Sequence, residues 1–333
     1  MSYNNKIEIL KESIKKRSDV AVIIPTFRSF EITKDTISRI IKKNVNFSFD
    51  ILIVDNQGFD FRKILEKFPT INYIILKNNV GSSGSHYIAV SKLFEYGYKY
   101  YCLSDNDAYP IDKNCIKAQI EYLKNNPTCG AVLPHREGRP NGIVKNSEFH
   151  FFMTRRDVIK KVGLPNKNYF LSFDDIDYST RVRQKGYYIF RIDKRYYHPF
   201  AKTSSLFNIS IYFRSRGVLI FLFSKQIFFE NKIEYFFYFL KYIIFHSLHS
   251  IILLDFSIIK TLAKSFSDFF FCKLETTHER NKFSVKPIDE DINAFDFNIE
   301  KNRLFLYYGK KFVNKNDDFQ SYFQIFRTKR NFK

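Results

Sequence analysis

The sequence predicts an α/β fold: a Rossmann-like, mostly parallel sheet flanked by helices, with a helical, aromatic-rich C-terminal extension. Short apolar runs alternate with stretches of helical periodicity over the first two thirds of the chain. Strand signals then fade, and long stretches rich in Phe, Tyr and Ile follow. This order favours right-handed strand–helix–strand crossovers. It divides the chain into a basic segment 1–18, a sheet domain 19–205 and a helical region 206–333.

The strands and helices of the sheet domain follow in order. "VAVIIPTF" (20–27) and "FDILIVDNQG" (49–58) are near-continuous apolar runs, typical of strands covered on both faces. "INYIILKNN" (71–79) and "YKYYCLSDND" (98–107) repeat this pattern. Helical spacing of apolar residues, or a glycine-rich start, predicts the helices between them. These helices cover 30–44, 60–69 and 81–97.

The net charge and the hydropathy of the chain indicate which classes of partner it can bind. The 333 residues carry a formal net charge of +20, which indicates an anionic partner: nucleic acid, an anionic membrane surface or a phosphorylated substrate. The first twenty residues have no apolar core of a secretory signal. Two apolar segments, 217–229 and 242–254, are too short and too close to charged residues to span a bilayer. Attachment to a membrane surface is therefore favoured over spanning.

Two aspartates end the fourth predicted strand, in "LSDNDAYP". In an extended segment Asp105 and Asp107 point to one face and Asn106 points away. Converging carboxylates repel each other unless a cation lies between them, and oxygen ligands suit Mg²⁺ or Mn²⁺ beside a substrate phosphate. The alternative is an ordinary turn, in which Asp and Asn are common.

A second acidic group lies in "NYFLSFDDIDYSTRVRQKGY". Asp174 and Asp177 resemble a capping box at a helix start, and Gly186 stands where a C-cap glycine belongs. Asp175 is left without a structural duty. Burial near a substrate would raise its pKa, which suits a general base acting on a hydroxyl.

Three weaker signals lie at the same expected edge of the sheet. Asp55 ends a buried strand, where its carboxylate can accept a hydrogen bond from a nucleobase or a ribose. Gly81 and Gly84, in "NNVGSSGS", allow close approach of a ligand to the backbone, although the spacing is not the dinucleotide fingerprint. His198 ends the strand-like stretch "YYIFRIDKRYYHP" and could complete a metal site.

The order of these motifs is more specific than any one of them. P-T-F, V-D-N, N-x-G-x-x-G, D-x-D, "FDDIDY…R…GY" and a final His follow one another between Val20 and Phe213. This succession resembles the family 2 glycosyltransferases of GT-A fold. Within that family it is most similar to the bacterial galactofuranosyl- and rhamnosyl-transferases.

The resemblance implies a role for each motif. Asp55 would contact the nucleobase, Asp105 and Asp107 would hold Mn²⁺ or Mg²⁺ against the donor diphosphate, His198 would add a metal ligand, and Asp175 would be the catalytic base. His86 and Arg28 depart from the residues usual in these relatives, as does Gly217 after "IYFRSR". The other residues implied on the donor side are Pro25, Thr26, Arg28, Asn79, Gly81, Gly84 and Asn106. Those implied for the acceptor or the diphosphate are Asp174, His86, Arg214 and Arg216.

The resemblance also implies an activity and a location. The expected reaction is inverting transfer of galactofuranose or rhamnose from a UDP- or dTDP-linked donor to a lipid-linked cell-surface glycan. The expected location is the bacterial cytoplasm, on the cytoplasmic face of the inner membrane, with the C-terminal helices on the membrane or in a homo-oligomer. Nucleic acid is not an expected partner. The alternatives are another nucleotide-sugar enzyme, such as a nucleotidyltransferase, or a non-catalytic basic protein that binds a polyanion or a membrane.

Overall fold

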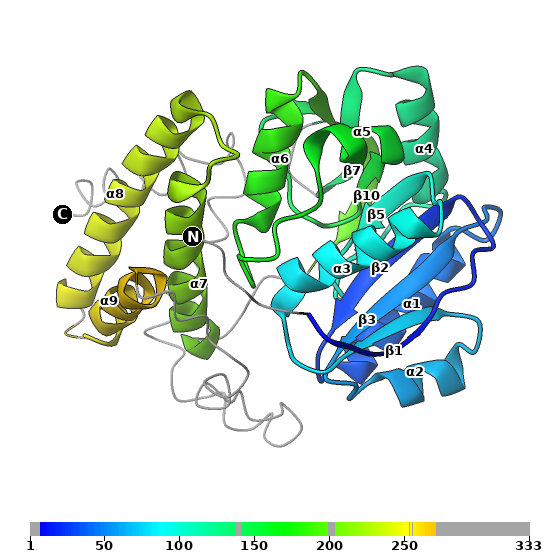
Figure 1. Ribbon diagram of the computed structural model, residues 1–333, viewed down its shortest axis with the longest axis horizontal. Coiled ribbons are helices and arrows are strands. Elements are labelled where there is room, and N and C mark those ends of the chain that lie inside the picture. Colours follow the sequence, from blue (N-terminus) through cyan, green and yellow to red (C-terminus); the bar gives the residue numbers. More distant parts are fainter. Residues whose placement is uncertain (1–6, 137–140, 199–203, 253, 255, 271–333) are drawn as a thin grey trace, which may run out of the picture.

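A central sheet with helices on both faces stands beside a group of three helices (Figure 1). The computed structural model describes residues 7–136, 141–198, 204–252, 254 and 256–270. The sheet and its flanking helices match the expected α/β class, with helices α7–α9 as the C-terminal helical region.

The sheet has ten strands in the order β1-β4-β3-β2-β5-β9-β7-β10-β6, and β8 pairs with β10. Strands β4, β3, β2, β5, β7 and β10 run in one direction, while β9 lies antiparallel between β5 and β7. The sheet is thus mostly parallel. The strands are β1 (Ile9–Ser13), β2 (Val20–Thr26), β3 (Asp50–Asn56), β4 (Asn72–Leu76), β5 (Tyr100–Leu103), β6 (Tyr109–Pro110), β7 (Cys129–Arg136), β8 (Gly142–Val144), β9 (Phe152–Arg155) and β10 (Tyr188–Tyr197).

Two hydrophobic cores lie on opposite faces of the sheet. Because side chains alternate along a strand, Val22 and Ile24 of β2 enter one core while Ala21 and Ile23 enter the other. The first core includes residues of α1, α2 and α4, and the second includes residues of α3, α5 and α6. The six helices are α1 (Phe30–Lys43), α2 (Phe61–Lys67), α3 (Gly81–Glu95), α4 (Cys115–Asn125), α5 (Arg156–Val162) and α6 (Asp174–Gln184).

The four predicted strands and the three predicted helices between them are present as β2, β3, β4 and β5 with α1, α2 and α3. Strands β1, β6, β7, β8 and β9 and helices α4 and α5 were not predicted. Strand β1 lies within the N-terminal segment 1–18 and pairs antiparallel with β4, so this segment adds an edge strand to the sheet.

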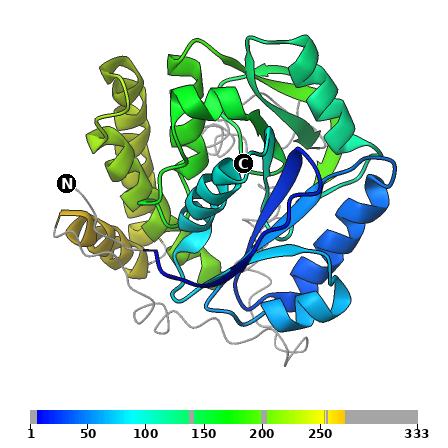
Figure 2. The ribbon, with the colours of Figure 1, turned by 45° about the vertical axis from the view of Figure 1, so that its right-hand side comes forward.

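The C-terminal helices form a third core. Helices α7 (Ser204–Phe223), α8 (Phe229–Ile252) and α9 (Ser257–Phe270) pack together around Tyr235, Phe239 and Phe269. Figure 2 shows them as a group beside the sheet domain. Tyr169 and Phe173, from the segment before α6, join this core. Across the described part of the chain, none of the helices has the length and apolar character needed to cross a bilayer.

Candidate active site

The two aspartates after β5 lie in a turn. The N–H of Ala108 donates to the carbonyl of Asp105 over 3.4 Å, so the predicted extended geometry of this segment is wrong. The side chains nevertheless approach a common partner. Nε2 of His198 lies 3.3 Å from Oδ1 of Asp107 and 3.9 Å from Oδ2 of Asp105. The structure therefore brings the three predicted metal-binding residues together.

His150 is a further member of this group that the sequence analysis missed. It lies just before β9, the strand that pairs with β5. Its Nε2 lies 3.0 Å from Oδ2 of Asp105, and its ring stacks on that of His198 with centroids 3.9 Å apart. A single His between two Phe residues, in "EFHFF", has no spacing that marks a ligand. Only the pairing of β9 with β5 reveals it.

Asp105, His150 and His198 have the chemistry of a metal site. One ligand atom from each of the three lies within 4.8 Å of the others. On its far side, Nδ1 of His150 lies 3.2 Å from the hydroxyl of Tyr196 and 3.5 Å from Oε2 of Glu148. A carboxylate behind a metal-binding His fixes the orientation and basicity of the ring. These residues therefore fit a divalent cation with mixed nitrogen and oxygen ligands.

The electrostatics of the group agree with this geometry. Although burial acts in the opposite direction, the interactions with Asp105 and Glu148 raise the pKa of His150 to about 10. Burial alone would raise the pKa of Asp105. The hydrogen bond from His150 outweighs burial and holds the pKa of this carboxyl below its usual value. Without a cation, a protonated His150 supplies the positive charge that Asp105 attracts.

Helix α6 places two more carboxyl groups against this cluster. Its first residue is Asp174, and its N-cap is Phe173, so the predicted capping box, with Asp174 as the cap, is wrong. Asp177 instead forms a buried ion pair with Arg181 at 2.7 Å and accepts a hydrogen bond from Tyr169. The predicted C-terminal glycine is confirmed, because Gly186 follows the helix with φ +80°.

Asp174 and Asp175 have raised pKa values. Burial, aided by the charges of Glu148 and Asp105, raises the pKa of Asp175 to about 7. Burial and the charges of Asp175 and Asp105 raise the pKa of Asp174 well above its usual value. Both residues lie within electrostatic reach of Asp105, which places the start of α6 near the end of β5. A carboxyl with a pKa near neutrality can gain and lose a proton under ordinary conditions.

The chain around this helix start is strained. Phe170, Ser172 and Phe173 all have positive φ angles, between 65° and 74°. Phe151, beside His150, also has a positive φ, of 58°. Bulky residues rarely adopt this conformation, and such strain clusters at functional sites. Gly81 at the start of α3 lies against the same segment, since an added Cβ would come within 2.0 Å of the carbonyl oxygen of Phe170.

Asp55 has the environment expected of a base- or ribose-binding group. Its Oδ2 accepts hydrogen bonds from the N–H groups of Asp60 (2.8 Å) and Phe61 (2.7 Å), whereas its buried Oδ1 has no hydrogen-bond partner among the described residues. Burial raises its pKa to about 6. An unpaired acceptor in a buried position is unfavourable until a donor reaches it.

The other predicted donor-side residues surround the end of β2. Pro25 is buried in β2, and Thr26 donates a 2.8 Å hydrogen bond to Asp60. The amide of Asn106 donates to Ser29 over 2.6 Å, which ties the aspartate turn to the start of α1. Arg28 is exposed, and its guanidinium lies 4.3 Å from the ring centroid of Phe59.

Asn79, Gly81 and Gly84 shape the start of α3. Oδ1 of Asn79 accepts a hydrogen bond from the N–H of Gly81. An added Cβ on Gly84 would lie 2.6 Å from a methyl of Val80. Packing within the protein therefore explains both glycines, and their contact with a donor remains a prediction.

The residues predicted for the acceptor or the diphosphate have different surroundings. His86 is fully buried with its ring edge against Phe149, and burial lowers its pKa to about 4. Arg216 is buried in α7. Arg214, in the same helix, lies close enough to His246 of α8 to lower the pKa of that side chain. Of these residues, Asp174 and His86 lie close enough to Asp105 to interact with its charge.

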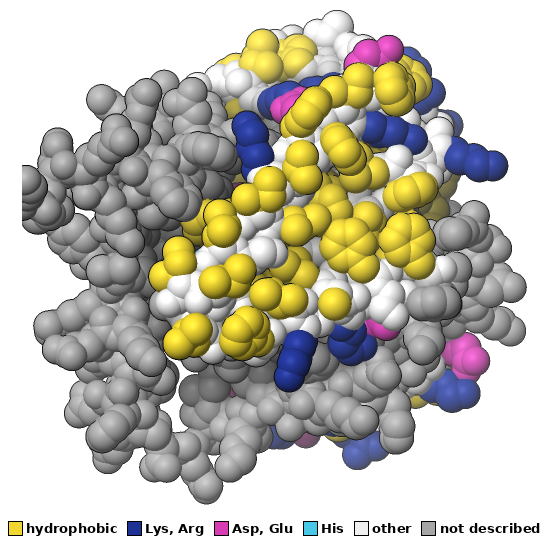
Figure 3. Space-filling model, turned by 90° about the vertical axis from the view of Figure 1, so that its left-hand side faces the viewer, with side chains coloured by type: hydrophobic (Ala, Val, Ile, Leu, Met, Phe, Trp, Pro, Cys, Tyr) yellow, Lys and Arg dark blue, Asp and Glu magenta, His cyan; other side chains and the backbone are white. Residues whose placement is uncertain are grey.

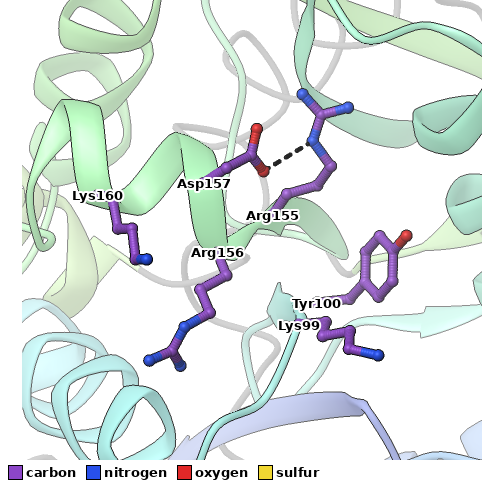
Figure 4. Close-up of a pocket in the computed structure, with 6 residues that line it drawn as sticks. All are labelled: Lys99, Tyr100, Arg155, Arg156, Asp157 and Lys160. Atoms are coloured by element: carbon purple, nitrogen blue, oxygen red, sulfur yellow. Dashed lines mark hydrogen bonds and ion pairs between the residues drawn. The ribbon is translucent and has the colours of Figure 1, made fainter.

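A basic pocket lies at the opposite end of β5 and has another character. Figure 4 shows its lining side chains, which come from the start of β5 and from the junction of β9 with α5. Both arginines are engaged: Arg155 donates to the carbonyls of Leu123 and Pro127, and Arg156 donates to the carbonyl of Phe94. These bonds give the arginines a structural role. The lining residues are Lys99, Tyr100, Arg155, Arg156, Asp157 and Lys160.

Comparison with known proteins agrees with the fold. The model of the Glycosyl transferase family 2 matches residues 21–195, more than half of the chain. No curated protein matches the chain in sequence. Two solved structures have similar folds. Mannosyltransferase PcManGT from Pyrobaculum calidifontis, in complex with GDP-Man and Mn²⁺, is 12% identical with a TM-score of 0.54 over 82% of this chain and 92% of that one. S. aureus TarS 1-349, in complex with UDP-GlcNAc, is 16% identical with a TM-score of 0.50 over 92% and 91%.

Proposed function

Because the chain belongs to glycosyl transferase family 2 and is therefore a glycosyltransferase, we propose that it transfers a sugar from a nucleotide-sugar donor to an acceptor hydroxyl with inversion. One observation carries the proposal. The start of α6, with Asp174 and Asp175, faces the cluster of Asp105, His150 and His198. A carboxyl able to take a proton thus lies across from residues suited to a cation and a diphosphate.

In the proposed reaction, different residues of the chain have different roles. Asp175 accepts the proton of the acceptor hydroxyl as its oxygen attacks the anomeric carbon and the bond to the nucleoside diphosphate breaks. Asp105, His150 and His198 would hold Mn²⁺ or Mg²⁺, with Asp107 beside them. When bound, this ion supplies positive charge that stabilises the departing diphosphate. The free Oδ1 of Asp55 accepts a hydrogen bond from the nucleobase or the ribose.

Substrates and location follow from the motif pattern and the charge. UDP-galactofuranose and dTDP-rhamnose are the proposed donors, and a lipid-linked cell-surface glycan is the proposed acceptor. With a net charge of +20, the enzyme is proposed to act on the cytoplasmic face of a bacterial inner membrane, where anionic headgroups attract basic residues.

Asp175→Asn tests the proposed mechanism. The substitution keeps the size and the hydrogen bond from the N–H of Ile176 but removes the proton acceptor. We expect turnover to fall by about 10²–10⁴-fold, the usual contribution of a general base, while UDP or dTDP binding by calorimetry stays unchanged. Asp157→Asn is the control, because Asp157 also lies in the first turn of a helix but is paired with Arg155 far from the cluster. Full transfer by Asp175→Asn would remove this residue from the mechanism.

A further inference from the structure

Helix α8 has apolar residues on two sides, but the rest of the protein covers only one of them. Its buried residues recur at intervals of three or four, the spacing of one helix face. A second set of large apolar residues recurs at the same spacing on the outer side and is exposed to solvent. The surface helix of a water-soluble protein normally carries polar residues there. The buried set is Tyr235, Phe239, Tyr242, His246 and Ser250; the exposed set is Phe229, Ile233, Phe236, Phe237, Leu240, Ile244, Leu248, Ile251 and Ile252.

The exposed set belongs to a wider surface, here called the apolar face. Of the 22 large hydrophobic residues that are exposed in the described chain, 14 lie between residues 223 and 270. Figure 3 shows hydrophobic side chains spread across this side of the molecule, with Lys and Arg at the edges. Contiguous exposed apolar surfaces of this kind mark interaction sites. The apolar face comprises the exposed set of α8 with Phe223, Phe228, Leu254, Phe256 and Phe270.

We infer that the apolar face inserts into the interface of an anionic lipid bilayer. The net charge of +20 complements a negative surface. Within α8, α9 and the segment before them, Lys225, Lys241 and Lys260 are exposed, against one exposed acidic residue, Glu230. A second copy of the chain would bring a surface of the same sign. Since no described helix can span a bilayer, the helices lie in the interface plane, with the apolar side buried and the lysines among the headgroups.

The helical region is packed tightly against the site. An added Cβ on Gly217 of α7 would lie 2.7 Å from Cβ of Phe173, the residue before Asp174. Phe173 shares a core with α7, α8 and α9. A membrane bound at the apolar face is therefore held in a defined position relative to Asp175. The inference rests on the proposed function for its purpose, presentation of a lipid-linked acceptor, although bilayer binding can be measured without it.

Vesicle flotation of the full chain tests the inference. The probes are vesicles of phosphatidylcholine and vesicles in which part of it is replaced by phosphatidylglycerol. We expect the chain to float with the anionic vesicles and to be released by salt, which screens the headgroups. Replacing Phe237, Leu240 and Ile244 together by Ser should weaken vesicle binding by about tenfold or more, because three large apolar side chains no longer enter the interface.

A matched variant controls for loss of surface hydrophobicity. Ile32, Ile41 and Val45 are exposed apolar residues on and after α1, and replacing all three by Ser should leave flotation unchanged. The six side chains are 42–72% exposed, so serine removes little buried surface at either site, and thermal melting checks folding. For the wild-type chain, hydrogen exchange should show vesicle-dependent protection in 229–252.

Three results would overturn the inference. They are equal flotation of the wild type and the α8 variant, no vesicle-dependent protection of 229–252, and a wild-type dimer by light scattering that the α8 variant loses without any vesicle binding. Titration of UDP or dTDP with Mn²⁺ in the absence of vesicles reports on the proposed function separately. Membrane binding without nucleotide binding would leave the inference standing and reject the proposed UDP- and dTDP-linked donors.

Discussion

At the scale of single residues, Asp175 combines a favourable chemistry with an unfavourable contribution to stability. An ordinary Asp has a pKa of 3.8, and burial raises that of Asp175 to about 7 in the folded chain. Between these values the folded state binds more protons than the unfolded state. The free energy of unfolding therefore falls as pH rises from about 4 to about 7. Glu148, Asp105 and Asp174 add to the effect by repulsion, and His150 opposes it.

Asp175→Asn should consequently stabilise the protein while inactivating it. Above pH 7 we expect the variant to melt roughly 3 °C or more above the wild type, and the difference should shrink as pH falls toward 4. Calorimetry without divalent ions at several pH values measures this trend. A difference that does not depend on pH would show that Asp175 is not a carboxyl of raised pKa.

His150 should contribute to metal binding through its ring. We expect His150→Gln to weaken Mn²⁺ binding in the presence of nucleotide by about 10–100-fold, comparable with the effect of removing residues that support a ligand. Electron paramagnetic resonance detects both the bound Mn²⁺ and its coupling to imidazole nitrogen. His135→Gln is the control, because His135 lies near Asp193 outside the cluster. Unchanged affinity and nitrogen coupling in His150→Gln would contradict the assignment.

At the residue level, the proximity of three strand-end residues could be predicted from the sequence, while their metal-binding role stays a prediction. Asp105, Asp107 and His198 were expected together and lie together, because they follow strands whose carboxyl ends share one edge of the sheet. His150 and Glu148 could not be predicted in this way. Their position depends on the antiparallel insertion of β9 beside β5, a long-range pairing that local sequence does not encode.

At the scale of elements, two glycines from neighbouring helices pack closely against the turn before α6. Gly81 of α3 meets the carbonyl of Phe170, and Gly217 of α7 meets Phe173 and the carbonyl of Ser172. The turn has strained φ angles at three residues, so it keeps its shape only if its surroundings allow no other. These two close contacts supply that restraint.

Gly217→Ala should therefore disturb catalysis from a distance. The new methyl would lie 2.7 Å from Cβ of Phe173 and 3.1 Å from the carbonyl oxygen of Ser172, so the turn must move. We expect a loss of about 1–3 kcal/mol in the free energy of unfolding, with kcat at least tenfold lower and nucleotide affinity unchanged.

Gly186→Ala is the matched control for this variant. It alters a glycine at the other end of α6, with positive φ and open space around it. It should lower stability through backbone strain alone, by about 1 kcal/mol, and leave kcat unchanged. If Gly217→Ala kept full kcat, the contact would have no part in positioning Asp174 and Asp175.

Some helices and strands can be predicted from the local sequence more readily than others. Strands β2 and β3 are uniformly apolar and buried on both faces, and their pattern alone identified them. Strand β1, "ILKES", lies at the sheet edge, has no buried residue, and lacks a regular alternation of half-buried and exposed residues, so its pattern did not identify it as a strand. The start of α6 was misplaced by one residue because a bulky Phe in the left-handed conformation, rather than an Asp, caps it.

At the scale of the whole molecule, the candidate active site and the apolar face lie on adjoining but separate surfaces. The cluster of Asp105, His150 and His198 lies at the edge of the sheet, whereas the apolar face lies on the outer side of α8. Helix α7 joins the two through its contact with Phe173. Sequence composition indicated the helical, aromatic-rich character of the C-terminal region, but only its packing shows which side of α8 remains uncovered.

This separation predicts how activity depends on the form of the acceptor. The chain with Phe237, Leu240 and Ile244 replaced by Ser should transfer sugar to a short-chain, water-soluble acceptor at the wild-type rate, because the three side chains lie outside the site. With the acceptor embedded in anionic vesicles, the variant should be about tenfold slower or more, since it no longer concentrates at the bilayer. Rates with the two acceptors, measured side by side for the wild type, this variant and the Ile32, Ile41 and Val45 control, test the idea. Equal losses with both acceptors would mean that α8 supports the site itself, and no loss with either would mean that the acceptor is met away from the membrane.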